Sequence, residues 1–290
     1  MGSADYLIIT PARNEGDHLE ATIASVAAQE ILPRKWIIVN DGSTDNTAQL
    51  IDAAAKRFPW IRGVHRPDRG FRKAGGGVIE AFYDGYAANG TDPWDYLVKL
   101  DADLSFDPSY FARVIAHFEA DPKLGIAGGT ICNLFNGKLV EESNVDPLFH
   151  VRGATKIYRR ACWEAIGGLI KAPGWDTLDE MKANMLGWST RTLKDLELHH
   201  YRIAGGADGN WKNWVKNGLA NYITGYHPAF MLCKCVKRAV AGRSLRTPVA
   251  LGWGFFSGYL KRIPHADPEV ARYVRREQMK RLLHKPSLWS

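Results

Sequence analysis

Short apolar runs alternate with segments of helical periodicity along the first 130 residues of the chain. Between the apolar runs, hydrophobic positions recur every three or four residues, as at Leu19, Ile23 and Val26. Continuous apolar strands joined by helices predict a parallel sheet that helices cover on both faces. The predicted strands are residues 6–10, 36–40, 61–65 and 96–100.

Beyond about residue 135 the pattern becomes irregular and aromatic. Residues 154–168 predict a strand followed by a short helix that ends at two glycines. Residues 176–188 predict a second helix, with Asp176 as its cap. From Asn210 onward the sequence is helical in pattern and rich in Trp, Tyr, Lys and Arg.

The charge distribution separates two parts of the chain. The formal net charge is +7, yet residues 201–290 alone hold 16 Lys and Arg against 4 Asp and Glu. An acidic body with a basic end predicts chemistry in the first part and attachment to an anionic partner in the second. We therefore expect a catalytic domain over residues 1–205, with halves at about 1–130 and 131–205, and a basic helical extension over residues 206–290.

Other features narrow the class of protein. No window reaches the roughly 18 uncharged apolar residues of a membrane-spanning helix, and residues 247–260 are interrupted by glycines. The N-terminus lacks a basic segment before its first strand, so we expect no cleaved signal. The four cysteines show neither zinc nor redox spacing, which predicts reduced thiols in a cytoplasmic protein.

Polar residues crowd the carboxyl ends of three predicted strands, the edge at which parallel sheets bind ligands. Asn14 and Glu15 follow the first strand, Asp41 follows the second, and Asp101 and Asp103 follow the fourth. Turn formation alone explains the cluster around Asp41, since Asn, Asp, Gly and Ser are common turn residues. Alternatively, Asp41 accepts hydrogen bonds from a base or a ribose.

Asp101 and Asp103 project from the same side of an extended segment because they are two residues apart. Mg²⁺ typically takes one or two carboxylates together with substrate phosphates. An isolated D-x-D is also compatible with an ordinary turn. Its place beside two other polar strand ends favours a metal site.

A basic segment precedes the glycine cluster at residues 75–77 and contains Arg66, Arg69, Arg72 and Lys73. Cations next to a helix N-terminus bind phosphate together with backbone N–H groups. The alternative is a solvated basic loop. Neither a P-loop nor a G-x-G-x-x-G motif is present, so neither a kinase-type nor a dinucleotide site is indicated.

A later acidic cluster contains Asp176, Asp179 and Glu180. Asp176 and Asp179 have the spacing of a helix cap and its third residue, so capping alone explains both. A carboxylate at a helix start that faces the open edge of the sheet also suits a general base. His199 and His200 follow and are candidates for a further metal or diphosphate contact.

The segments TPARNEG, NDGSTDNT and LDADLS, followed by the acidic pair, resemble in order and spacing the family-2 glycosyltransferases of the GT-A fold. The resemblance implies a Rossmann-like, mostly parallel α/β sheet flanked by helices, with the helical extension beyond it. It also implies inverting transfer of a sugar from a nucleotide-sugar, helped by Mg²⁺ or Mn²⁺ on the donor diphosphate. The implied base is Asp179, with Glu180 as the runner-up because the order of the pair is reversed.

The predicted donor and metal residues combine this resemblance with the strand-end, basic and histidine clusters. The donor residues are Pro11, Ala12, Asn14, Glu15, Asp41, Arg72, Lys73 and Asp101. The metal residues are Asp103, Asp101 and His200.

One stretch is similar to a subgroup, the polyprenyl-phosphate mannosyl- and glucosyltransferases. RGFRKAGGG followed by DADLSFDP matches their basic-glycine and acidic segments, and their acceptor is an ionised lipid phosphate. The chain departs from them after His200 and retains an acidic pair. We therefore expect a lipid-linked or glycan acceptor in cell-envelope or exopolysaccharide synthesis, with a polyprenyl-phosphate sugar synthase as the alternative.

The basic extension, with its interleaved aromatic residues, predicts peripheral contact with the inner face of the cytoplasmic membrane. Packing of aromatic helices against the catalytic domain is the alternative. A sugar-nucleotide pyrophosphorylase would need a glycine-rich basic loop after the first strand, where TPARNEG stands. A non-enzymatic module that binds anionic surfaces leaves the strand-end carboxylates unexplained, and no nucleic-acid-binding motif is present.

Overall fold

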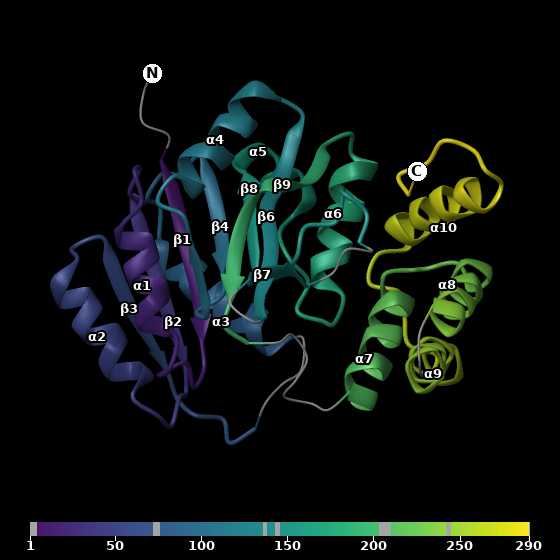
Figure 1. Ribbon diagram of the computed structural model, residues 1–290, viewed down its shortest axis with the longest axis horizontal. Helices are drawn as coiled ribbons and strands as arrows, with labels where there is room; N and C mark the ends of the chain where they lie inside the picture. The colour runs from purple at the N-terminus through teal and green to yellow at the C-terminus, as the bar shows by residue number, and fades with distance from the viewer. Residues whose placement is uncertain are drawn as a thin grey trace.

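A nine-stranded sheet forms the centre of the chain (Figure 1). The computed structural model describes residues 5–71, 76–135, 138–142, 146–202, 210–241 and 245–289. The strand order is β3-β2-β1-β4-β8-β6-β9-β5, and β7 pairs with β6. The strands are β1 (Tyr6–Ala12), β2 (Lys35–Asp41), β3 (Ile61–Arg66), β4 (Tyr96–Leu100), β5 (Leu104–Phe106), β6 (Leu124–Phe135), β7 (Lys138–Glu141), β8 (Thr155–Arg159) and β9 (Ser189–His200).

The first four strands form the parallel half of the sheet, as the apolar runs predict. β1 pairs with β2 and β4, and β2 pairs with β3, all in parallel. Beyond β4 the sheet becomes mixed, since β8 runs antiparallel to both β4 and β6. β6 and β9 are parallel to each other, and β9 pairs antiparallel with β5. This second half places residues from late in the sequence next to β4.

Helices cover both faces of the sheet because its strands are apolar on both sides. Tyr6 and Ile8 face one layer, and Leu7 and Ile9 face the other. The first layer contains α1 (Leu19–Ala27), α2 (Thr47–Arg57) and α4 (Tyr110–Ala120), and the second contains α3 (Gly77–Asn89), α5 (Arg160–Ile166) and α6 (Trp175–Met185).

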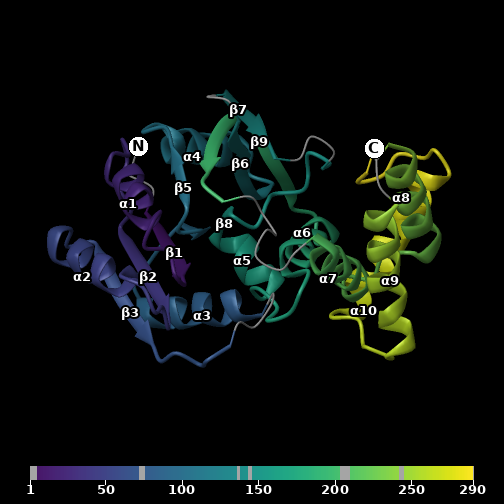
Figure 2. The ribbon, with the colours of Figure 1, turned by 60° about the horizontal axis from the view of Figure 1, so that its bottom comes forward.

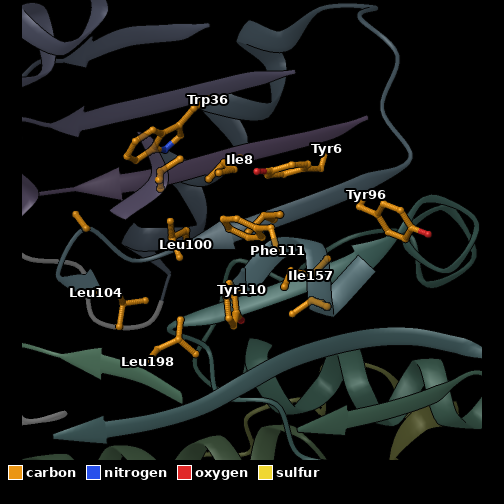
Figure 3. Close-up of a cluster of buried hydrophobic side chains, with 14 of the residues drawn as sticks. Tyr6, Ile8, Trp36, Tyr96, Leu100, Leu104, Tyr110, Phe111, Ile157 and Leu198 are labelled. Carbon is orange, nitrogen blue, oxygen red and sulfur yellow. The ribbon is translucent and has the colours of Figure 1, made fainter. Parts of the chain in front are cut away.

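The core under α1, α2 and α4 is built from large aromatic side chains (Figure 3). Trp36 is fully buried, and its indole N–H donates to Thr10 Oγ1 at 2.9 Å. Tyr6 packs against Phe111 with ring centroids 4.8 Å apart. Burial of each such side chain stabilises the fold by roughly 1.5–3 kcal/mol, so this layer holds the parallel strands and their carboxyl ends in a fixed arrangement.

The C-terminal part is helical, as its sequence pattern predicts. It comprises α7 (Asn210–Ile223), α8 (Pro228–Ala241), α9 (Arg246–Leu260) and α10 (Pro268–Leu282). These helices lie beside α6 and away from the parallel strands (Figures 1 and 2). A third apolar cluster, which includes Leu178 and Met181 of α6 and Phe255 of α9, joins them to the α/β part.

Two glycines allow α7 and α9 to approach each other at backbone distance. A Cβ atom on Gly218 would lie 2.0 Å from the carbonyl oxygen of Leu251, and one on Gly254 would lie 2.0 Å from that of Val215. Any larger residue at either position would push the two helices apart. Within the described residues, no helix has both the length and the apolar character to cross a membrane.

Candidate active site

The loops that follow β1 and β2 are tied together at the carboxyl edge of the sheet. Asn14 has a φ of 55°, a left-handed conformation that Asn adopts more readily than most residues. Its side-chain oxygen accepts from Thr44 N at 2.8 Å, and its own N–H donates to Ser43 Oγ at 3.0 Å. Pro11 and Ala12, the last residues of β1, pair with the end of β2. The two predicted donor-binding segments therefore form one surface.

Asp41 lies at the end of β2 and is 7 % exposed. Its two carboxylate oxygens form ion pairs with Arg66 and Arg69. Arg13 donates to the Asp41 carbonyl oxygen at 2.6 Å and pairs with Asp68 at 2.7 Å. Arginines are thus fixed beside Asp41 at the strand end. The predicted donor residues Arg72 and Lys73 lie outside the described residues.

Glu15 faces the D-x-D motif and pairs with Arg202 at 3.0 Å. Burial raises the pKa of Glu15 to about 8, and the negative charges of Asp103 and Asp101 act in the same direction against Arg202. Three carboxylates therefore converge on one place at the sheet edge. Such crowding of negative charge favours a bound cation.

The two aspartates of the D-x-D motif have different partners. Asp101 forms an ion pair with the buried Lys99, whereas Asp103 Oδ2 lies 3.3 Å from His200 Nε2. Pairing of β5 with β9 sets Leu104 opposite His200 and so brings the imidazole to Asp103. Burial raises the pKa of Asp101 despite Lys99, while His200 outweighs burial and lowers the pKa of Asp103.

His200 is buried and incompletely bonded. Burial alone would lower its pKa, but its contact with Asp103 and the nearby Glu142 carboxylate raise it to about 10. Its Nδ1 is 3.8 Å from Glu142 Oε2 and has no hydrogen-bond partner. His200 thus lies between two carboxylates, with Nε2 toward Asp103 and the unsatisfied Nδ1 toward Glu142.

The residues at the sheet edge suit a metal ion that a substrate helps to hold. Among the described residues, no three His, Cys, Asp or Glu side chains are arranged as a complete metal site. Mg²⁺ and similar ions commonly take one or two carboxylates and complete their shell with phosphate oxygens and water. Asp101 and Asp103 stand at this edge as the one or two carboxylates of such a shell, and His200, which contacts Asp103, stays a predicted ligand.

Asp179 and Glu180, the predicted base and its runner-up, are sealed inside the protein. Lys156 Nζ lies 2.9 and 3.0 Å from the two Asp179 oxygens, and Tyr158 donates to Oδ2 at 2.6 Å. Glu180 accepts from Val151 N at 2.7 Å and pairs with Lys156. Burial raises the pKa of Asp179 to about 6, but neither carboxylate lines the large cavity described below. Their placement argues against the predicted role, because a base must touch the acceptor.

Asp176, expected to cap the helix, has a different position. The N-cap of α6 is Gly174, with a φ of 87°, and no side chain caps this helix. The Asp176 side chain is half-buried in the first turn, where it lies next to Gly153. The Gly153 carbonyl accepts from Lys99, the ion-pair partner of Asp101. The sequence offered one signal for Asp176: it is the acid of α6 closest to the helix start.

A cavity of about 1310 Å³ joins these groups. Asp101, His200 and Asp176 line one end, and residues of α7, α8 and α10 line the other. Such a volume exceeds the ~300–1,000 Å³ of ordinary small-molecule sites, so it has room for two substrates. An acidic sheet edge and a second carboxylate that face one cavity are parts that group transfer can use.

Comparison with known proteins identifies the family. Residues 7–150 match the family described as glycosyl transferase family 2. The chain belongs to this family. The glycosyltransferase is 35 % identical over 117 residues to a poly-beta-1,6-N-acetyl-D-glucosamine synthase of Staphylococcus aureus. That match covers 40 % of this chain but only 26 % of the relative's length.

Solved structures support the GT-A fold of this glycosyltransferase. A mannosyltransferase from Pyrobaculum calidifontis, in complex with GDP-Man and Mn²⁺, superposes with a TM-score of 0.56 at 17 % identity; the match covers 97 % of this chain and 76 % of the other. Residues 1–349 of TarS from S. aureus, in complex with UDP-GlcNAc, give a TM-score of 0.55 at 13 % identity over 95 % and 81 % of the two chains. The predicted recognition and fold are confirmed.

Proposed function

We propose that this glycosyltransferase moves a sugar, with inversion, from a UDP- or GDP-sugar to a hydroxyl of a glycan or lipid-linked acceptor in cell-envelope or exopolysaccharide synthesis. The observation that carries the proposal is the shared cavity, which Asp101 and Asp176 line together. The P. calidifontis and TarS structures contain GDP-Man with Mn²⁺ and UDP-GlcNAc respectively. They support a nucleotide-sugar and a divalent cation for this chain.

Each part of the site has a role in such a transfer. The surface formed by Pro11, Ala12, Asn14 and Asp41 holds the nucleotide at the strand ends. Mg²⁺ or Mn²⁺, held by Asp103, Asp101 and His200 with the donor diphosphate, offsets the charge on the leaving group when it is bound. The ion pair with Lys99 fixes the Asp101 carboxylate. The aromatic core under α1, α2 and α4 keeps this edge of the sheet rigid.

Asp176 is the base in this proposal, in place of Asp179. Its carboxylate reaches the cavity and accepts the proton of the acceptor hydroxyl as that oxygen attacks the sugar carbon. The Asp176 carbonyl oxygen accepts a hydrogen bond from the buried Lys156, which fixes the first turn of α6. Lys156 in turn is held by Asp179, so the sealed acids position this turn rather than take part in the reaction.

A lipid phosphate as the attacking group is the second candidate. It would bring an anion to the end of the cavity that Asp101, Asp176 and Glu142 line. Like charges there oppose binding. A neutral hydroxyl that loses its proton to Asp176 avoids this repulsion, so we favour it.

The test is a panel of UDP-, GDP- and dTDP-sugars scored for nucleotide release and for donor binding, with Mn²⁺ and with EDTA. We expect one donor to bind and turn over in the presence of Mn²⁺ and not in the presence of EDTA. Asp103→Asn should weaken donor binding with Mn²⁺ by about 10²-fold. Asp195→Asn, an exposed change on β9, is the matched control. Failure of every donor to bind with the metal would refute the proposal.

We also propose peripheral membrane contact at the inner face of the cytoplasmic membrane, through an apolar stripe on α8 and α9. The stripe has helical spacing on each helix, and its members are 37–83 % exposed. Exposed basic residues, among them Lys261 and Arg262, flank it and suit anionic headgroups. The members are Leu232, Val236, Val240, Leu245, Val249, Trp253, Phe256 and Leu260.

Vesicle flotation tests this contact. We expect the protein to float with vesicles of phosphatidylglycerol and phosphatidylcholine and to lose this association with Val236→Glu/Trp253→Glu. Leu186→Glu, at an exposed leucine next to the end of α6, is the control. Flotation of the double variant at the wild-type level would show that the stripe does not contact lipid.

A further inference from the structure

The large cavity is polarised along its length. At the end near the sheet, Arg152 is neutralised by Glu142 at 2.7 Å and Asp146 at 3.3 Å. The opposite end is lined by four cations from α8 and α10, none of which has a carboxylate partner among the described residues. These cations are Lys234, Lys237, Arg238 and Arg281.

The unpaired cations are held among aromatic rings. The guanidinium of Arg238 lies 4.6 Å from the ring centroid of Trp214, and Lys234 Nζ lies 5.2 Å from that of Tyr226. Burial and the positive charge of Arg238 lower the pKa of Lys234 to about 8, against the opposing charge of Asp146. The protein therefore keeps positive charges close together at this end, where a bound anion would relieve their repulsion.

A row of amide side chains connects the two ends. Asn213, Asn217 and Asn221 of α7 are four residues apart and all line the cavity. Positions at this spacing lie on one face of a helix. Each carboxamide both donates and accepts hydrogen bonds, which suits sugar hydroxyls. Trp214 and Trp289 add aromatic surface along the same cavity.

We infer that the cation end of the cavity binds a phosphate group of the acceptor, while the hydroxyl that is glycosylated lies at Asp176. This inference rests on the proposed function, because it names the class of acceptor for the same site. The acceptor is then a phosphate-bearing saccharide, with its sugar hydroxyls along the α7 amides. The phosphate belongs either to a lipid carrier or to the glycan itself.

The face of α8 opposite to the cavity fits a lipid source. Lys234, Lys237 and Arg238 line the cavity, whereas Val236 and Val240 belong to the exposed apolar stripe. Helix α8 alone would therefore separate a lipid-linked phosphate at the membrane surface from the cavity cations. A phosphate carried by a free glycan would use the same cations without the stripe.

The experiment is calorimetric titration in EDTA with three probes: n-decyl phosphate, inorganic pyrophosphate and the neutral decyl β-glucoside. Lys237→Gln/Arg238→Gln removes two cavity cations, and Lys56→Gln/Arg57→Gln on α2 removes two exposed cations outside the cavity and the stripe as the matched control. We expect the cavity variant to weaken decyl phosphate by about 10-fold or more, and the control to change it by less than about 2-fold. Arg281→Gln on α10 gives an independent check, because it leaves the contact of Arg238 with Trp214 intact.

The probes separate the sources of the phosphate. Tighter binding of decyl phosphate than of pyrophosphate indicates a lipid carrier, and the reverse indicates a phosphorylated glycan. Equal binding of decyl phosphate and decyl glucoside, or equal affinities in all variants, would overturn the inference. Nucleotide-sugar binding with Mn²⁺ is measured in parallel: if it persists while the phosphate site is absent, the proposed transferase stands and the inference alone has failed.

Discussion

Two acidic pairs of this chain look alike in sequence and differ in their surroundings. Asp101 and Asp103 follow a strand and stand at an open edge, where Asp101 lines the cavity. Asp179 and Glu180 lie within α6, and Lys156 pairs with both. Asp101 lines the cavity although Lys99 pairs with it, whereas neither acid of the second pair reaches that cavity. Contacts with residues that are distant in the sequence, rather than the acids themselves, therefore decide which pair can reach a substrate.

The largest effect that sharpens this comparison is expected from Asp176→Asn. Loss of the base should slow transfer by about 10²–10⁴-fold, because an amide cannot accept the acceptor proton. Donor binding with Mn²⁺ should remain at the wild-type level. Single-turnover transfer measured with the donor and an active acceptor fraction provides the check.

Asp179→Asn is the matched comparison for that experiment. It should lower stability because the buried Lys156 loses a charged partner. The folded fraction should keep most of its transfer rate. A folded Asp179→Asn protein without transfer, together with an active Asp176→Asn protein, would reverse the assignment of the base.

The next effect concerns the stability of the sealed pair. Lys156→Met leaves the buried Asp179 without its cation and Glu180 with His150 alone, which should lower the free energy of unfolding by about 3–5 kcal/mol. Chemical denaturation monitored by circular dichroism measures it.

The control for this change is an ion pair at the surface. Lys194→Gln breaks the exposed pair with Glu141 and should cost less than about 1 kcal/mol. Equal losses in the two variants would mean that the interior pair contributes no more than a surface contact.

The smallest effect is a dependence of stability on pH. The pKa of Asp179 is raised from 3.8 to about 6 by burial, so the folded protein keeps this proton to higher pH than the unfolded chain. Its contribution to stability is therefore complete below about pH 4 and is lost as pH rises through about 6. Denaturation of wild type and Asp179→Asn at pH 4, 5, 6 and 7 should show their difference shrinking with pH. Parallel profiles would contradict the shift.

Much of the fold follows from local sequence. The apolar runs that end at Thr10, Asn40 and Leu100 predict the parallel strands. The mixed half of the sheet was not evident, because the pairing of β8 with β4 depends on residues more than fifty positions apart. Local patterns do not encode such pairing.

The candidate site likewise contains residues that the sequence predicts and residues that it does not. The strand-end residues, such as Asp41 and Asp103, were found because a parallel sheet gathers its carboxyl ends at one edge. Asp176 was misinterpreted as a cap, since the sequence does not show that Gly174 begins the helix. The Asn213, Asn217 and Asn221 row was missed, because an amide stripe has meaning only beside a cavity.

The position of β8 has a consequence for how this enzyme can be divided. β8 pairs with β4 on one side and with β6 on the other, and Lys99 of β4 sits opposite its Lys156. In a fragment that ended after β4, that strand would become an unpaired edge of the sheet, and the buried Lys99 would be exposed to solvent. The half that we propose holds the nucleotide is thus not a separable module. Recombination that exchanged one half for a relative's would have to carry this strand with it, so donor and acceptor preferences are inherited together.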